Sequence, residues 1–160
     1  MKKIKVTANN IKEAAYGAYM DYIKYTEKWK KEASMGNFFV GYVGEAAYHQ
    51  FIGKKYIYKH YENTGDGGLD VKNVQIKTTT INKNRELCVT EGDRCFNNTA
   101  VSKLVLVYFD KTKAGKEVYI VGEISKKNFL DKSKRVTFNY NGKKAVKYIL
   151  SETALDKHFK

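Results

Sequence analysis

The residues from Ser102 to Phe109 limit the possible fold more than any other stretch of this sequence. They read Ser-Lys-Leu-Val-Leu-Val-Tyr-Phe, a nearly continuous apolar run. A strand of this kind is apolar on both sides, so it must be covered on both faces, as in the central sheet of an α/β protein. A second strand is expected at Val118–Ile124, and Lys111–Lys116 would be the hairpin loop between the two. The sequence therefore predicts a mixed α/β fold with one central sheet flanked by helices.

The length of the chain favours one domain. Its 160 residues, 42% of them apolar, can bury a sizeable core but are too few for two comfortable domains. We expect a single domain over 1–160, with an N-terminal strand and helix at 1–38, a central core at 39–125, and a C-terminal strand and helix at 126–160.

Targeting signals and disulfides are not visible in the sequence. No apolar run approaches the roughly 20 residues of a membrane span, and Met1–Lys5 are not followed by the apolar stretch of a signal peptide. Cys88 and Cys95 are the two cysteines, too few for a disulfide framework. We therefore expect a cytoplasmic protein that does not enter a membrane.

The remaining elements are predicted from periodicity and turn residues. A strand at 3–7 precedes a helix from Ile11 to about Glu32, which Asn9 or Asn10 would cap and Gly36 and Asn37 would end. Its expected apolar side is Ala14, Ala15, Ala18, Tyr19, Tyr22 and Ile23. Further expected elements are a helix at 39–52, an exposed or edge strand at 54–61, a turn at 64–68, strands at 69–71 and 74–80, a short element at 126–130, a strand at 144–150 and a helix from Ser151.

The charge of the chain points to a polyanionic partner. Thirty basic residues against 17 acidic ones give a net charge of +13, and 27 of the basic residues are lysines. Neutralising phosphates releases counterions, which favours nucleic acid as the partner. Lysine acts as a point charge on phosphate, whereas arginine reads guanine edges, so we expect backbone or shape recognition more than base readout. The alternative is that abundant Lys, Asn, Ile and Tyr reflect an AT-rich coding genome, which with the small size suggests a viral or mobile-element origin.

The segment from Gly65 to Thr79 carries the most chemical information. A two-residue turn at Lys72-Asn73 would place Asp70 opposite Gln75, with Lys77 two residues along on the same face. Gly68 would leave room beside this polar patch. The other face would be apolar and would show Leu69, Val71, Val74 and Ile76.

A carboxylate, an amide oxygen and an ammonium group on one patch are typical of a metal site with a charged helper. Mg²⁺ prefers oxygen ligands, so Asp70 would bind it directly and Gln75 would offer its side-chain oxygen. The main-chain carbonyl of Ile76 would complete the set. Lys77 would orient a metal-bound water or stabilise the negative charge of the transition state.

An Asp followed, after a short hairpin, by a (Asp/Glu/Gln)-X-Lys triplet resembles the PD-(D/E)XK nuclease superfamily. That family usually adds a glutamate from the preceding helix, and Gly41-Tyr42-Val43-Gly44-Glu45-Ala46-Ala47-Tyr48 matches with Glu45. The resemblance spans residues 39 to about 124. It implies a restriction-endonuclease-like core and a Mg²⁺- or Mn²⁺-dependent nuclease that hydrolyses DNA phosphodiester bonds.

The resemblance assigns Glu45, Asp70 and Gln75 to the metal and Lys77 to catalysis. Lys54, Lys55 and Lys59 are our expected phosphate contacts, because they border this site in sequence. Related nucleases that cut both strands often act as dimers, so a homodimer is compatible with the resemblance.

Three departures from the family pattern stand out. No proline precedes Asp70, Gln75 replaces the usual acid and so removes one negative ligand, and the second core helix is reduced to a short segment near 89–98. The replacement at Gln75 favours a rival interpretation, a non-catalytic Lys-rich DNA-binding protein with this fold.

Simpler interpretations remain for several residues. Asp66 is best explained as a turn residue, Asp70 could also be one, and Glu45 could be a solvated helix residue. The histidines do not cluster, although His49 lies one turn after Glu45. The tyrosines at 16, 19, 22 and 25 could stack on bases, but we favour a core-and-rim role for them.

Overall fold

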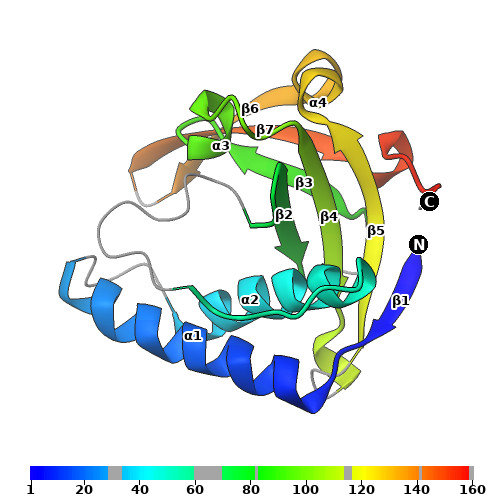
Figure 1. The fold of residues 1–160 in the computed structure, drawn as a ribbon. Helices are drawn as coiled ribbons and strands as arrows, with labels where there is room; N and C mark the ends of the chain where they lie inside the picture. Colours follow the sequence, from blue (N-terminus) through cyan, green and yellow to red (C-terminus); the bar gives the residue numbers. More distant parts are fainter. Residues whose placement is uncertain (29–33, 60–69, 82, 114–116, 141, 159–160) are drawn as a thin grey trace.

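In the part of the chain that the structure describes, the protein is a mixed α/β structure with two separate β-sheets, not one central sheet. The computed structural model describes residues 1–28, 34–59, 70–81, 83–113, 117–140 and 142–158. Helices, the first sheet and the second sheet form successive layers (Figure 1). Within the described residues no helix is long and apolar enough to cross a membrane.

The first sheet contains the apolar strand that the sequence singles out. Its order is β1-β5-β4-β2, with β1 at Lys2–Lys5, β5 at Glu117–Ser125, β4 at Lys103–Phe109 and β2 at Val74–Thr79. Strands β2 and β4 are parallel, and β5 is antiparallel to both β4 and β1. As predicted, β4 is buried on both faces: Val105 and Val107 join one core, and Leu104 and Leu106 join another. Strand β2 lies at the edge of this sheet.

Helix α2, at Met35–Phe51, covers one face of the first sheet, and helix α1, at Ala8–Lys28, packs along α2 (Figure 1). Helix α1 begins earlier than expected, because the Thr7 hydroxyl and not Asn9 or Asn10 accepts from a first-turn amide, that of Asn10 at 3.3 Å. Gly36 and Asn37 lie in the first turn of α2 and do not end α1. Ser34 caps α2 and accepts from the Asn37 amide at 3.2 Å.

The packed side of α1 consists of small residues. Ala14 and Ala18 are buried, whereas the predicted apolar residues Ala15, Tyr19, Tyr22 and Ile23 are exposed. Tyr16 is exposed as well, so the core part of the tyrosine interpretation is wrong for positions 16, 19 and 22; the side chain at 25 lies outside the described ones. Small residues occupy the packed side of α1 because this helix lies close against α2, which leaves no room for large side chains between them.

The expected strand at 54–61 is absent from its described part, residues 54–59. Tyr58 explains the difference, because it attaches this segment to α1 and not to a sheet edge. Its amide donates to Glu13 at 2.9 Å and its hydroxyl donates to Asp21 at 2.5 Å. Its ring also fills the space over Gly17, where a Cβ would lie 2.4 Å from a ring carbon.

The second sheet packs on the opposite face of the first. Its order is β3-β7-β6, with β3 at Glu86–Thr90, β7 at Lys143–Ser151 and β6 at Lys134–Tyr140. Leu87, Val89 and Leu150 pack here with Leu104 and Leu106. Two short helices border this core, α3 at Arg94–Asn97 and α4 at Lys126–Lys132.

The C-terminal half differs from the expectation in three places. The segment at 89–98 holds the end of a strand and a four-residue helix, not the family's core helix. Strand β6 was not predicted, although the strand at 144–150 is confirmed as β7. The helix expected from Ser151 is only a short 3-10 turn, Glu152–Ala154, and another such turn, Lys111–Lys113, follows β4.

Candidate active site

A tight turn at the start of β2 brings the predicted polar residues together. The Val74 amide donates to the Val71 carbonyl at 2.7 Å, and the Asp70 amide donates to the Val74 carbonyl at 3.0 Å. Lys72 has a φ of 48°, the left-handed conformation that such a turn requires. The predicted turn, with Val71 opposite Val74, is confirmed. Asp66, Gly68 and Leu69 lie outside the described residues.

The Asp70 carboxylate is fixed by two donors from β2. The Gln75 side chain donates from Nε2 to Asp70 Oδ2 at 2.6 Å, and the Ile76 backbone amide donates to the same oxygen. Asp70 and Gln75 are therefore neighbours, as the turn predicted. Because two donors hold this oxygen, Asp70 also contributes to the local structure.

Gln75 is the buried polar residue of this site. It is only 6% exposed, and its Oε1 has no hydrogen-bond partner among the described residues. Buried polar atoms are nearly always paired in native proteins, because an unpaired one costs about 1–3 kcal/mol. An oxygen acceptor thus stands beside the Asp70 carboxylate with unused capacity for a cation or a donor.

Lys77 lies on the same face of β2 and forms an ion pair that the sequence did not predict. Its Nζ is 2.6 Å from Asp93 Oδ2. Burial lowers the pKa of Lys77 most, but the charge and hydrogen bond of Asp93 and the charge of Asp70 more than offset it. The net result is a raised pKa, so the Lys77 ammonium stays charged at neutral pH and lies in the field of both aspartates.

Asp93 occupies the N-cap of α3 and accepts from the Cys95 amide at 3.0 Å. Burial alone would raise the pKa of Asp93. The charge and hydrogen bond of Lys77 lower this pKa by more than burial raises it, so the net shift is downward. The signal that could have revealed Asp93 is local, since an aspartate after Gly92 is typical of a helix cap. Burial and then Asp93 raise the pKa of Cys95 to about 12, which disfavours the thiolate form.

Glu45 lies on α2, which packs on the face of β2 that carries Val74 and Ile76. The preceding residue, Gly44, touches β2 so closely that a Cβ there would lie 1.9 Å from Thr78 Oγ1. Burial is the main cause of the raised pKa of Tyr56, and the negative charges of Glu45 and Asp70 add to it. Both carboxylates therefore act electrostatically on the Tyr56 hydroxyl, which links Glu45 to the Asp70 turn.

The oxygen atoms of this cluster could hold one hard divalent cation. Within the described residues, no three His, Cys, Asp or Glu side chains gather closely enough to hold a metal ion. The predicted set differs from such a group, because it combines two carboxylates with the Gln75 amide oxygen and the Ile76 carbonyl. The unpartnered Oε1 fits that use, while the lower negative charge predicts weak metal affinity.

The three predicted phosphate contacts are exposed lysines. Lys54, Lys55 and Lys59 lie in the segment after α2 that forms no strand. Burial lowers the pKa of His49, the hydrogen bond between its Nδ1 and the Glu45 carbonyl opposes this shift, and the charges of Lys54 and Lys59 lower the pKa further. His49 itself lies 5.3 Å from the Tyr56 ring, centre to centre. Their binding to phosphate stays a prediction.

No family model, curated protein or solved structure matches this chain. The resemblance to the PD-(D/E)XK nucleases therefore stays a prediction, which rests on Glu45, Asp70, Gln75 and Lys77.

Proposed function

We propose that this protein is a metal-dependent deoxyribonuclease whose active site is the polar face of β2. The observation that carries the proposal is the buried Gln75 amide, with Nε2 on Asp70 and Oε1 unpartnered among the described residues. A divalent cation bound to Asp70 would give that oxygen a partner. The restriction-endonuclease-like core is part of the same proposal, supported by the order of α2, the Asp70 turn, β2 and the parallel strand β4.

Each residue has a separate role in this proposal. A bound Mg²⁺ or Mn²⁺ supplies Lewis-acid polarisation of the phosphate and a more acidic water. Asp70 and Glu45 contribute the negative charge that holds the ion, and Gln75 contributes a neutral oxygen. Lys77 stabilises the negative charge that develops on the phosphate. Asp93 is a positioning residue, because it holds Lys77 Nζ in an ion pair at 2.6 Å.

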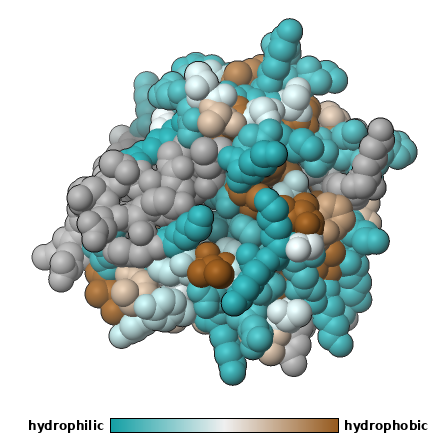
Figure 2. Space-filling model, viewed as in Figure 1, coloured by the Kyte–Doolittle hydropathy of each residue, from teal (hydrophilic) through white to brown (hydrophobic). Residues whose placement is uncertain are grey.

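The surface charge supports DNA as the substrate. Hydrophilic side chains predominate among the coloured residues of the face seen in Figure 2, with hydrophobic residues scattered among them. The net charge of +13 comes mainly from lysines, which bind phosphates without reading bases. DNA affinity should therefore fall steeply with salt and depend little on sequence.

A cleavage assay tests the proposal directly. The purified protein is incubated with linear, circular, single-stranded and four-way-junction DNA in Mg²⁺, Mn²⁺ or EDTA. We expect cleavage of at least one substrate with either metal and none in EDTA. Cleavage that continues in EDTA, or no cleavage of any substrate, would contradict a metal-dependent nuclease.

A second candidate function is DNA binding without catalysis. Two observations favour it: Asp93 already neutralises Lys77, and Gln75 supplies no charge to a metal. Under this alternative the protein binds DNA in a salt-dependent manner but never cuts it with Mg²⁺ or Mn²⁺. The same panel of substrates, read first for binding and then for cleavage, separates the two functions.

A further inference from the structure

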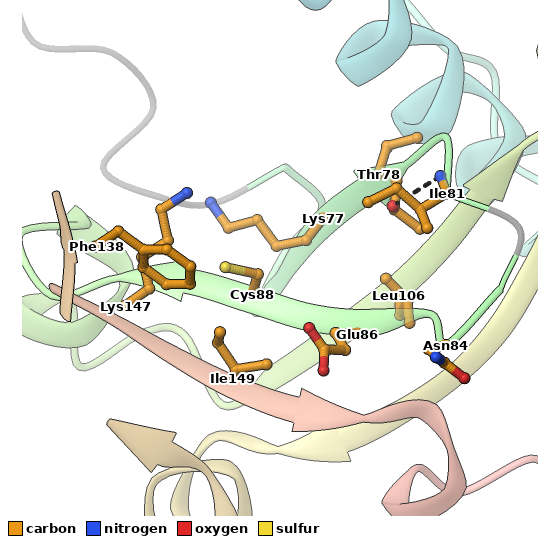
Figure 3. Close-up of a pocket in the computed structure, with 11 residues that line it drawn as sticks. Lys77, Thr78, Ile81, Asn84, Glu86, Cys88, Leu106, Phe138, Lys147 and Ile149 are labelled. Atoms are coloured by element: carbon orange, nitrogen blue, oxygen red, sulfur yellow. Dashed lines mark hydrogen bonds between the residues drawn. The ribbon is translucent and has the colours of Figure 1, made fainter. Parts of the chain in front are cut away.

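A pocket of about 290 Å³ lies between the polar face of β2 and the second sheet. Figure 3 shows its residues, which come from β2, the segment after it, and β3, β7, β6 and β4. Lys77 lines it, so the pocket adjoins the candidate active site. Its volume is near the lower end of the roughly 300–1,000 Å³ typical of small-ligand pockets, which suits one nucleotide and excludes a duplex.

Two lysines give one end of this pocket a positive character. Lys77, Lys147 and Cys88 all line the pocket. Figure 3 shows the amino groups of the two lysines pointing toward the same end of the pocket. Lys77 is paired with Asp93, but within the described residues no carboxylate forms an ion pair with Lys147. Lys147 therefore offers its charge to a ligand.

The wall next to Lys147 is apolar and includes an accessible aromatic ring. Phe138 is 36% exposed, and Lys147 Nζ lies 5.4 Å from the centre of its ring. Ile149 continues this wall along β7 (Figure 3). Toward the other end the lining turns polar, with Asn84 and Glu86. Such side chains accept from or donate to the edge of a base.

The chemistry of the pocket changes from a cation, to an apolar wall, to hydrogen-bonding groups. A nucleotide has the matching order of phosphate, base face and base edge. A base that is paired and stacked in a duplex cannot enter a pocket of this size, so only an unpaired nucleotide fits. Aromatic stacking and lysine–phosphate contacts are the usual means of holding single strands.

We infer that this pocket binds one unpaired nucleotide of the DNA strand, with its phosphate on Lys147 and its base against Phe138. The inference rests on the proposed function, because it names the substrate class of that site: DNA that has, or readily forms, an unpaired nucleotide beside the phosphate that is cut.

The test is a binding titration in EDTA, where cleavage plays no part. The fluorescence anisotropy of a labelled oligothymidine of about 15 nucleotides is compared with that of a blunt duplex of equal length. We expect Lys147→Ala and Phe138→Ala each to weaken single-strand binding about tenfold and to change duplex binding less than about twofold. Phe138→Trp, which keeps an aromatic face, should bind the single strand like the wild type.

Lys144→Ala is the matched control. Lys144 is an exposed lysine on the same strand, β7, but the register places it on the opposite face of the sheet from Lys147. It should weaken single-strand and duplex binding equally and only slightly. Single-strand affinity that is unchanged in both Lys147→Ala and Phe138→Ala, or lost equally in Lys144→Ala, would overturn the inference.

The two proposals can fail separately. If the wild type never cleaves but the pocket variants selectively lose single-strand binding, the nuclease proposal fails and the nucleotide site stands. If the wild type cleaves and the pocket variants bind single strands normally, the nucleotide site fails and the nuclease proposal stands.

Discussion

The two faces of β2 differ in what they contribute to the molecule. On the side of α2, Val74 and Ile76 are buried in a core with Val105 and Val107. On the other side Gln75 and Lys77 meet the polar groups of Asp70 and Asp93. Successive side chains of a strand point to opposite faces, so a single strand can stabilise the fold and build a site at once. This comparison predicts that mutations on the two faces affect different measurements.

The largest effect is expected from Asp70→Asn. We expect cleavage to slow about 1,000-fold, because a metal contributes several kcal/mol and each 1.36 kcal/mol is tenfold in rate. The amide oxygen can still accept from the Ile76 amide, so the thermal unfolding temperature should change little. The control is Asp131→Asn, an exposed carboxylate on α4. Equal cleavage rates for Asp70→Asn and the wild type would show that the polar face of β2 takes no part in catalysis.

The next effect is expected on the opposite face, from Ile76→Ala. The side chain is 6% exposed and packs beneath α2, so its truncation should lower the free energy of unfolding by about 3 kcal/mol. Urea denaturation measures the loss, and the folded protein should cleave at nearly the wild-type rate at low temperature. A rate that falls as far as in Asp70→Asn would show that the two faces are not separable.

A smaller effect is expected from Asp93→Asn, which keeps a helix cap and removes the charge beside Lys77. Breaking this ion pair should cost about 2 kcal/mol of stability at pH 7. The pKa of Asp93 is lowered in the folded protein, so its contribution is present above its ordinary value of 3.8 and is lost as the pH falls further.

Unfolding measured across pH checks the Asp93 prediction. The difference in stability between Asp93→Asn and the wild type should disappear in acid. The pKa of Lys77 is raised by the same pair, so the difference should also shrink at alkaline pH, above the ordinary lysine value of 10.5. A difference that stays constant from neutral to strongly acidic pH would show that the charge of Asp93 does not stabilise the fold.

The smallest effect is expected from Gln75→Glu, which should lower the free energy of unfolding by about 1 kcal/mol in the absence of metal. The change removes the Nε2 donor to Asp70 and places two carboxylates together, so the protein should be less stable in EDTA and regain stability in Mn²⁺. The metal concentration for half-maximal cleavage should fall several-fold, because a second negative ligand is added. A half-maximal concentration that rises would argue against Gln75 as a ligand.

Local patterns made this site predictable. A two-residue turn and strict alternation were enough to place Asp70 beside Gln75 and Lys77 on one face, because both rules act within ten residues of sequence. The apolar run at 102–109 likewise predicted β4. These features depend on neighbours in the chain, which a sequence displays directly.

Features that depend on long-range packing were not predictable in this way. Asp93 reaches Lys77 only because β3 and α3 return to the edge of the first sheet. The tyrosines of α1 have helical spacing, yet Ala14 and Ala18 occupy the packed side because α1 and α2 lie close together. Strand β6 is an edge strand whose described residues are mostly exposed, and many of them are charged or polar. Its sequence therefore lacks the apolar signal of a central strand.

The most direct test of the central claim is Mn²⁺ binding, followed by the electron paramagnetic resonance signal of the free ion. In the function proposed above, the polar face of β2 holds the catalytic metal. We expect the wild type and Asp131→Asn to bind Mn²⁺ equally, and Asp70→Asn to bind it at least about tenfold more weakly. Wild-type protein that binds no Mn²⁺, or an Asp70→Asn variant that binds it as tightly as the wild type, would contradict the account.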